Sequence, residues 1–512
     1  MPVFDFHVHP SLKAQMCDQS QLPSPWDVIN IQFRNPTLLT RLLKCQGINE
    51  VIDSQASLSQ LLDGGANIIG LALHPPETAM MRDKLINTLA DQEQTQYIDR
   101  NRIRDIASGD IYFRMMNEEL SNLENSLSHD GKKLKLIQNI AEYDPHDMNT
   151  VHAVLSIEGP HAFWGVQQGK TEDEKWAEFW ENFEFFTDIN RILSINIAHL
   201  QQNHFSNHAF GIQIFKQEPF YPEGNGITQH GFRLLQRMEQ KGIMLDIKHM
   251  SLYARKQLKD YRPGTMSLPF ICTHAGLTGI EYGRRGHYFY DKDELRNGFL
   301  RVKHYKPAGY LAGTAFNASS INLYDEDVRD IIFSGGLIGL SLDQRILGLP
   351  DDTMMGDDYT DDIFDTEVIS PLEKQFFTDV RAGRPTEEDY LDVYDILRED
   401  RQNYPRYHAR HFMNTIFHFF VIAGKYRINP ALVAERICIG SDFDGMINPV
   451  DNCRNVSQYQ SFKNYLVSHF EEWEREAMYA LPVKISGFIK PRDLVENIFY
   501  KNGLRFLQEH FR

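Results

Sequence analysis

Histidines and carboxylates, the residue types that bind metal ions, close several short apolar segments of this sequence. His7 and His9 stand two residues apart in the segment PVFDFHVH, so on a strand both rings point to the same side. Two imidazoles on one side can hold a single metal ion. A His-x-His pair also occurs as a structural or surface feature, and the pair alone leaves both interpretations open.

Three more residues of this kind follow later apolar segments. Glu158 ends HAVLSIE and precedes Gly159 and Pro160, where a carboxylate could bridge two metals, cap a helix or form a loop salt bridge. His249 ends IMLDIKH and His274 ends PFICTH. A single histidine at a strand end is more often a hydrogen-bonding residue than a ligand, but two on consecutive strands favour a metal site.

Two further positions are candidates for the chemistry itself. Asp442 lies in GSDFDG after the last apolar segment. A carboxylate there can accept a proton from metal-bound water, whose pKa the metal lowers towards ~7. Asp444 could instead cap a helix or orient a ligand. His199 ends ILSINIAH, and the nearby His204 and His208 could compete for its role.

Eight apolar segments place these residues, and their length and branched side chains favour buried parallel strands. They are Pro2–His9, Ala66–His74, His152–Glu158, Ile192–His199, Ile243–His249, Pro269–His274, Leu337–Asp343 and Ile437–Asp442. Helices are predicted at Thr228–Gln240, Asp325–Phe333 and His411–Ala423, ending at Gly242, Gly335-Gly336 and Gly424. Eight such units predict an α/β fold, a (β/α)8 TIM barrel whose strand ends converge on one mouth.

The chain is predicted to be one metal-dependent hydrolase barrel domain, residues 1–512, with three insertions. Residues 76–150 are polar and helix-prone, and residues 281–320 are irregular and rich in Gly, Tyr and Arg. Residues 345–405 carry the acidic stretch DDTMMGDDYTDD. This stretch lacks the closing Glu of an EF-hand loop and is interpreted as a solvated loop.

Composition excludes several classes of function. The net charge of −17, from 70 acidic and 53 basic residues, argues against a nucleic-acid partner and against an anionic membrane surface. Five scattered cysteines without a CxxC pair indicate a reducing compartment. The N-terminal MPVFDFHVHP has no signal-peptide pattern, and no apolar run reaches the ~18 residues of a membrane span. We expect a cytoplasmic protein that acts on a small-molecule substrate.

Taken together, these segments resemble the membrane (renal) dipeptidase family of the amidohydrolase superfamily. The segments that carry the resemblance are DFHVHP, LSIEGPHA, LSINIAHLQQN, GIMLDIKHMS, FICTHAG, INLYDEDVRDIIFSGGLIGLS, ICIGSDFDG and GFIKPRDLVENIFYKNGLRFLQ. The resemblance runs from end to end and skips the three proposed insertions. It implies a zinc-dependent dipeptidase with two zinc ions per chain, and a homodimer.

The resemblance also implies a role for each site residue. It assigns five metal ligands: His7 and His9 to one zinc, His249 and His274 to the other, and Glu158 as the bridge. His199 matches the family histidine that contacts substrate near the scissile carbonyl. Asp442 matches the aspartate that handles the proton while a metal-bridging hydroxide attacks the carbonyl.

The sequence departs from the family pattern at two places. The family usually has HxD at the first motif, where this chain has HxH, and imidazole also binds zinc. The family arginine that recognises the dipeptide carboxylate is missing from the run Ser320–Asp325. Arg284 or Arg285 is the expected substitute; otherwise the substrate lacks that carboxylate. The alternatives are a hydrolase of another small amide, a lactone or an N-acyl amino acid, and a degenerate barrel that serves as a binding scaffold.

Overall fold

A computed structural model describes nine stretches of the chain. They are residues 2–43, 47–95, 97–211, 220–222, 226–261, 266–295, 298–349, 364–374 and 404–512. The acidic stretch at 351–362, interpreted above as a solvated loop, lies outside the described residues. None of the helices in the described stretches is long and apolar enough to cross a membrane.

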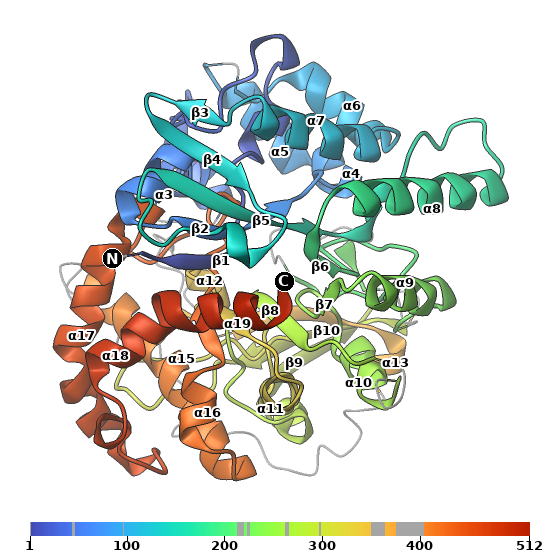
Figure 1. Ribbon diagram of the computed structural model, residues 1–512. Coiled ribbons are helices and arrows are strands. Elements are labelled where there is room, and N and C mark those ends of the chain that lie inside the picture. The colour runs from blue at the N-terminus through green and yellow to red at the C-terminus, as the bar shows by residue number, and fades with distance from the viewer. Residues whose placement is uncertain are drawn as a thin grey trace.

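Eight parallel strands close into a barrel (Figure 1). They are β1 (Phe4–Val8), β2 (Ile68–Leu73), β5 (Thr150–Glu158), β6 (Ile192–Asn196), β7 (Met244–Asp246), β8 (Phe270–Ala275), β11 (Ile338–Leu340) and β13 (Ile437–Ile439). Each strand pairs with the next, and β13 pairs back to β1 with Ile439 opposite Asp5, which closes the ring. All eight predicted strands and the predicted (β/α)8 architecture are confirmed.

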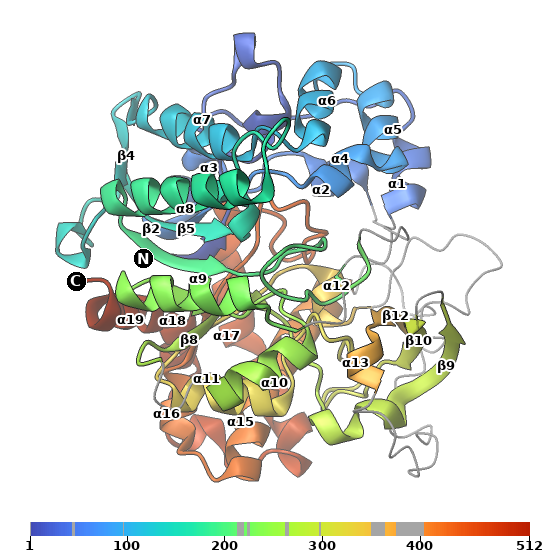
Figure 2. The same cartoon turned by 90° about the vertical axis from the view of Figure 1, so that its right-hand side faces the viewer.

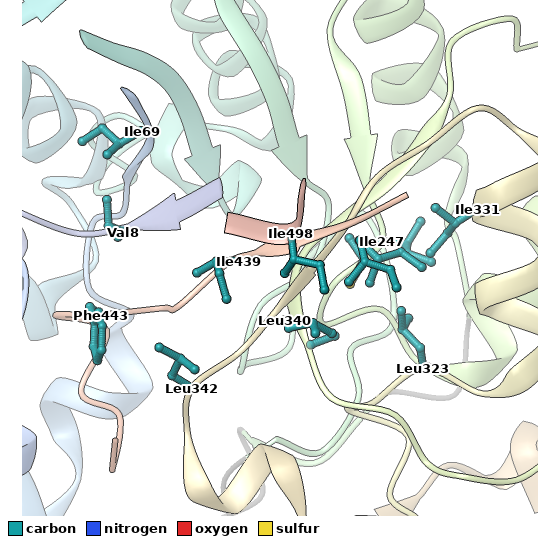
Figure 3. Close-up of a cluster of buried hydrophobic side chains, with 14 of the residues drawn as sticks. Val8, Ile69, Ile247, Leu323, Ile331, Leu340, Leu342, Ile439, Phe443 and Ile498 are labelled. Atoms are coloured by element: carbon teal, nitrogen blue, oxygen red, sulfur yellow. The ribbon is translucent and has the colours of Figure 1, made fainter. Parts of the chain in front are cut away.

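Side chains on the two faces of the strands build two layers of core. Phe6, Met244 and Ile271 belong to the cluster inside the barrel, where helix α19 (Asn502–His510) adds Phe506. Outward-facing side chains pack against the surrounding helices, as Figure 3 shows for the cluster that contains Ile439 and Ile498. Burial on both faces explains why these strands are continuous apolar runs in the sequence.

Two of the three predicted helices have the expected bounds. They are α9 (Gln229–Gln240), capped by the Thr228 side chain, and α11 (Asp325–Phe333). The third, α15 (Tyr404–Tyr426), continues past Gly424, so the prediction that it ends there was wrong. A Cβ at Gly424 would lie 2.6 Å from Cβ of Pro482. This glycine therefore permits close packing within the helix and does not terminate it.

The remaining helices surround the barrel. Before β6 they are α1 (Pro36–Leu43), α2 (Ile48–Ile52), α3 (Leu58–Gly64), α4 (Thr78–Arg82), α5 (Lys84–Gln92), α6 (Arg100–Ser108), α7 (Tyr112–Glu124) and α8 (Glu172–Ile189). Later in the chain they are α10 (Leu252–Tyr261), α12 (Gln344–Leu347), α13 (Pro371–Lys374), α16 (Pro430–Ala434), α17 (Tyr459–Glu476) and α18 (Pro491–Glu496). A π-helical turn at Asn497–Lys501 joins α18 to α19.

Residues 76–150 contain α4 to α7 and two short strands, β3 (Ser128–His129) and β4 (Lys132–Leu136). Figure 1 shows α5, α6 and α7 above the strands β1, β2 and β5. Their apolar side chains share a separate hydrophobic cluster with residues 16–52. β4 pairs in parallel with the first half of β5 and so extends the sheet outside the barrel.

Residues 281–320 are only partly irregular, contrary to expectation. They contain β9 (Phe289–Glu294) and β10 (Leu300–Tyr305), which form an antiparallel sheet with β12 (Phe364–Ile369) beside the barrel (Figure 2). In β10 the buried Leu300 and Val302 alternate with the more exposed Arg301 and Lys303, a strand pattern. The third strand, β12, is remote in sequence, so only the β9–β10 hairpin had a local signal.

Candidate metal centre

The carboxyl ends of the barrel strands bring four predicted ligand histidines around one carboxylate. His7 lies in β1 and His9 directly follows it, and their Nε2 atoms lie 3.0 Å apart. His249 and His274 follow β7 and end β8, and their Nε2 atoms lie 3.3 Å apart. Glu158, at the end of β5, lies between the pairs: its oxygens are 3.7, 3.4, 3.1 and 3.6 Å from the Nε2 atoms of His7, His9, His249 and His274, respectively. All five side chains are buried.

This donor set fits a divalent metal ion. If the two Nε2 atoms at 3.0 Å were both unprotonated, their lone pairs would repel each other. A proton or a cation shared between the two nitrogens removes that repulsion. Among the described residues, Nδ1 of His9 and Nδ1 of His249 are buried without a hydrogen-bond partner, so these rings are not held by ordinary hydrogen bonds alone. Imidazole nitrogens with carboxylate oxygens are the ligands that zinc takes in proteins.

Electrostatics prepare the histidines to be ligands. Burial lowers the pKa of His249 well below its usual value, and the positive field of His199 lowers it further. Burial likewise lowers the pKa of His274, with His7 adding to the effect. Neutral rings keep the lone pair that a metal needs. Although burial alone would raise the pKa of Glu158, the surrounding imidazoles hold it well below the usual value, so this carboxylate is ionised.

A further histidine at this mouth, His74, was missed by sequence reasoning. Its Nδ1 donates to the Glu158 carbonyl oxygen at 2.8 Å, which leaves Nε2 with the lone pair. Its ligand atoms lie within 4.8 Å of those of Glu158 and His199. Glu119 of α7 accepts the backbone N–H of His74 at 3.2 Å. The signal was available, because His74 ends the second apolar segment as the predicted ligands end theirs.

His199 is held as a cationic donor by a residue that the sequence did not reveal. Nδ1 of His199 donates to Glu77 at 2.9 Å, and the other oxygen of Glu77 accepts the N–H groups of Leu200 and Gln201 at 3.2 and 3.3 Å. Burial favours the neutral ring, but Glu77 and Glu158 raise the pKa of His199 to about 9. Nε2 of His199 faces Glu158 at 3.7 Å, inside the cluster.

The competing histidines lie elsewhere. Nε2 of His208 donates to the carbonyl oxygen of Phe220 at 3.0 Å, and burial lowers the pKa of His208 to about 4. His204 is exposed and packs against the ring of Trp164, with ring centroids 5.6 Å apart. Of the three, His199 is therefore the one that contacts the candidate ligands.

Asp442 lies at the open side of the cluster. Its oxygens are 3.4 Å from Nε2 of His9 and 3.9 Å from Nε2 of His274. Its side chain is 18% exposed, against 3% for Glu158, so of the two acids it is the more accessible to a substrate. Asp442 and His249 both have φ of +66°, a conformation that costs roughly 1–3 kcal/mol in a non-glycine residue. The surrounding fold therefore holds these two side chains against a local preference.

Neighbouring groups contact the candidate ligands or the segments that carry them. The Thr273 hydroxyl lies 3.0 Å from Nδ1 of His7 and 3.1 Å from Nδ1 of His274, and it donates to Asp246. Asp444 is an anchor: its carboxylate accepts the N–H groups of Gln55 and Ala56 at 2.8 and 2.9 Å and pairs with Lys13. Such supporting contacts orient the groups that bind a metal.

The two predicted arginines have other partners. Arg285 is fully buried, with one guanidinium nitrogen 2.7 Å from Glu367 and another 3.6 Å from Glu373. A substrate carboxylate would have to displace Glu367, so these surroundings argue against the predicted role. Arg284 is exposed, and its guanidinium lies 5.9 Å from the ring centre of Tyr288.

Comparisons with known proteins give structural similarity only. No family model matches the chain, and no curated protein matches it in sequence. Its structure is similar to that of dipeptidase AC, a metallopeptidase (TM-score 0.49, 16% identity, 100% of this chain and 99% of that chain). A metallopeptidase from Rhodobacter sphaeroides, bound to a phosphinate mimic of L-Ala-D-Ala, has TM-score 0.47, 14% identity and the same coverages. The probable dipeptidase PvdM from Pseudomonas aeruginosa has TM-score 0.47 and 12% identity over 89% of this chain and 88% of that chain. These likenesses are too distant to transfer an activity.

Proposed function

We propose that the protein is a metal-dependent hydrolase that holds zinc at the barrel mouth and cleaves the amide bond of a small dipeptide. The observation that carries the proposal is the pair of facing imidazole couples, His7 with His9 and His249 with His274, on either side of the ionised Glu158. Such a concentration of imidazole nitrogens around one buried carboxylate is typical of a metal site and not of a purely structural core.

Each remaining residue has a task in the reaction. Bound zinc supplies Lewis acidity towards the scissile carbonyl and activates water. The His199 imidazolium donates its Nε2 proton in a hydrogen bond to the carbonyl oxygen as negative charge develops there. The Asp442 carboxylate accepts the proton that the attacking water loses and passes it to the departing amine. Water is thereby split between the new carboxylate and the amine.

The choice of a dipeptide over other small amides, lactones and N-acyl amino acids is tested with a substrate panel. Purified protein is assayed for zinc by elemental analysis, then for hydrolysis of Ala-Ala, N-acetyl-alanine, a neutral amide and a lactone. Zinc together with Ala-Ala hydrolysis is expected. Zinc with turnover only of another compound selects the alternative hydrolase. Protein that takes up no transition metal after zinc loading would instead be a binding scaffold.

A further inference from the structure

Lys248 stands beside the metal ligands with no assigned role. It immediately precedes His249, and its side chain is buried, with 2% of the residue exposed. Burial lowers the pKa of Lys248, and the nearby carboxylates of Asp442, Glu158 and Asp246 counteract that shift. The lysine therefore belongs to the same mouth of the barrel as the cluster.

The Lys248 ammonium has less compensation than the buried Arg255 and Lys463. Its one hydrogen bond within the described stretches goes to the carbonyl oxygen of Ile321 at 3.4 Å, and none of their carboxylates lies within 4.0 Å of Nζ. By contrast, Arg255 lies 3.1 Å from Asp327, and Nζ of Lys463 lies 2.9 Å from Glu496. A buried ammonium without a paired anion is destabilising, so a residue of this kind indicates a partner that the chain itself does not supply.

The wall that faces Lys248 is rigidly held. Arg255 donates to the carbonyl oxygens of Ser320 and Asn322 at 2.8 and 3.3 Å, and these residues flank the Ile321 carbonyl. The Asn322 side chain accepts the N–H of Gly276, two residues after the ligand His274. Nζ of Lys248 therefore faces a wall of fixed shape, which an anion-binding site needs in order to discriminate.

We propose that Lys248 is a substrate-binding residue whose ammonium receives an anionic group of the substrate, a free carboxylate. The inference rests on the proposed function and narrows it. An anionic ligand would pair with this ammonium, which has no acid within 4.0 Å in the described stretches, whereas a neutral ligand would not. Dipeptides and N-acyl amino acids are then substrates in preference to neutral amides and lactones.

The test compares Lys248→Met, which keeps an unbranched side chain without charge, with Lys463→Met as a matched control. Lys463 is equally buried but has an acid partner and lies outside the site. Binding of N-acetyl-alanine and of N-acetyl-alaninamide to the zinc-loaded proteins is measured by isothermal titration calorimetry. The natural protein and Lys463→Met should bind the carboxylate at least about tenfold more tightly than the amide, and Lys248→Met should lose that preference.

Stability gives an independent readout. Removing an uncompensated charge should leave the melting temperature of Lys248→Met unchanged or higher, whereas Lys463→Met leaves Glu496 without its partner and should melt lower. Equal binding of acid and amide by the natural protein, binding of neither, or an unchanged preference in Lys248→Met would overturn the proposal. These measurements need no turnover, so a lack of hydrolysis refutes the proposed function without deciding the role of Lys248.

Discussion

Replacing Glu77 by glutamine tests whether this residue acts through His199. The carboxylate accepts from Nδ1 of His199 at 2.9 Å and holds the ring as a cation with Nε2 towards Glu158. Glutamine keeps the shape of the side chain but removes its charge. Its amide NH2 group is a donor, so it would face another donor: either Nδ1–H of His199 or the two backbone N–H groups that Glu77 accepts. The ring then loses its proton near neutral pH, and with it the donor to the reacting carbonyl.

The expected size of the effect follows from that one contact. A hydrogen bond to a charged group is worth roughly 1.5–3 kcal/mol, and 1.4 kcal/mol corresponds to about tenfold in rate. The His199 ring is needed in the transition state, where negative charge develops on the carbonyl oxygen. The substitution should therefore lower mainly kcat, by about 10- to 150-fold, and leave KM nearly unchanged. Zinc content should stay the same, since Glu77 is not among the predicted ligands.

A double-mutant cycle separates this role from simple support of the fold. We expect Glu77→Gln combined with His199→Asn to be no slower than His199→Asn alone, because Glu77 has nothing left to act on. Steady-state kinetics on the four proteins, with zinc analysis of each, decide the matter. If the two losses in kcat multiply, or if Glu77→Gln turns over within about threefold of the natural protein, the assignment of Glu77 to His199 is refuted.

Three other outcomes are expected. His249→Ala should lower zinc content and abolish hydrolysis, and full zinc with normal rates would remove it from the ligand set. Asp442→Asn should keep its zinc and reduce kcat by roughly 10²–10⁴-fold, whereas unchanged turnover would exclude it as the proton carrier. In the metal-free protein the raised pKa of His199, about 9 against 6.5 when unfolded, should stabilise the fold by ~3 kcal/mol below pH 6.5, and this stabilisation should be lost as the pH rises through 9. Denaturant unfolding between pH 6 and pH 10 should show that decline in the natural protein and a smaller one in Glu77→Gln, where Glu158 still acts on the ring.

The barrel and most of its polar mouth were predictable because, in a parallel barrel, burial fixes the strand sequence and topology fixes where the strand ends lie. Strands buried on both faces have apolar side chains on both faces, so their limits can be read from the sequence as continuous apolar runs. Their carboxyl ends all meet at one rim of the barrel. A histidine or carboxylate at such an end is therefore brought to the others whatever the distance along the chain. His74 obeys the same rule and could have been included.

Roles that depend on contacts between remote segments were not predictable. Glu77 lies three residues after His74, past the end of β2, and only folding brings it to His199, 122 residues later. Arg285 is a cation in the segment after β8, the strand that carries His274, yet two glutamates from β12 and α13 compensate its charge.

The sequence by itself determined which segments are buried and which residues stand at their ends, because burial and periodicity are local properties of the chain. The tertiary structure decided which charges are already neutralised and which are left for a ligand. In the folded protein, Lys248 has no acid within 4.0 Å in the described stretches, whereas Arg285 lies against two glutamates. The energy of a buried charge depends on the few ångströms around it, and that distance is fixed only when remote segments pack together.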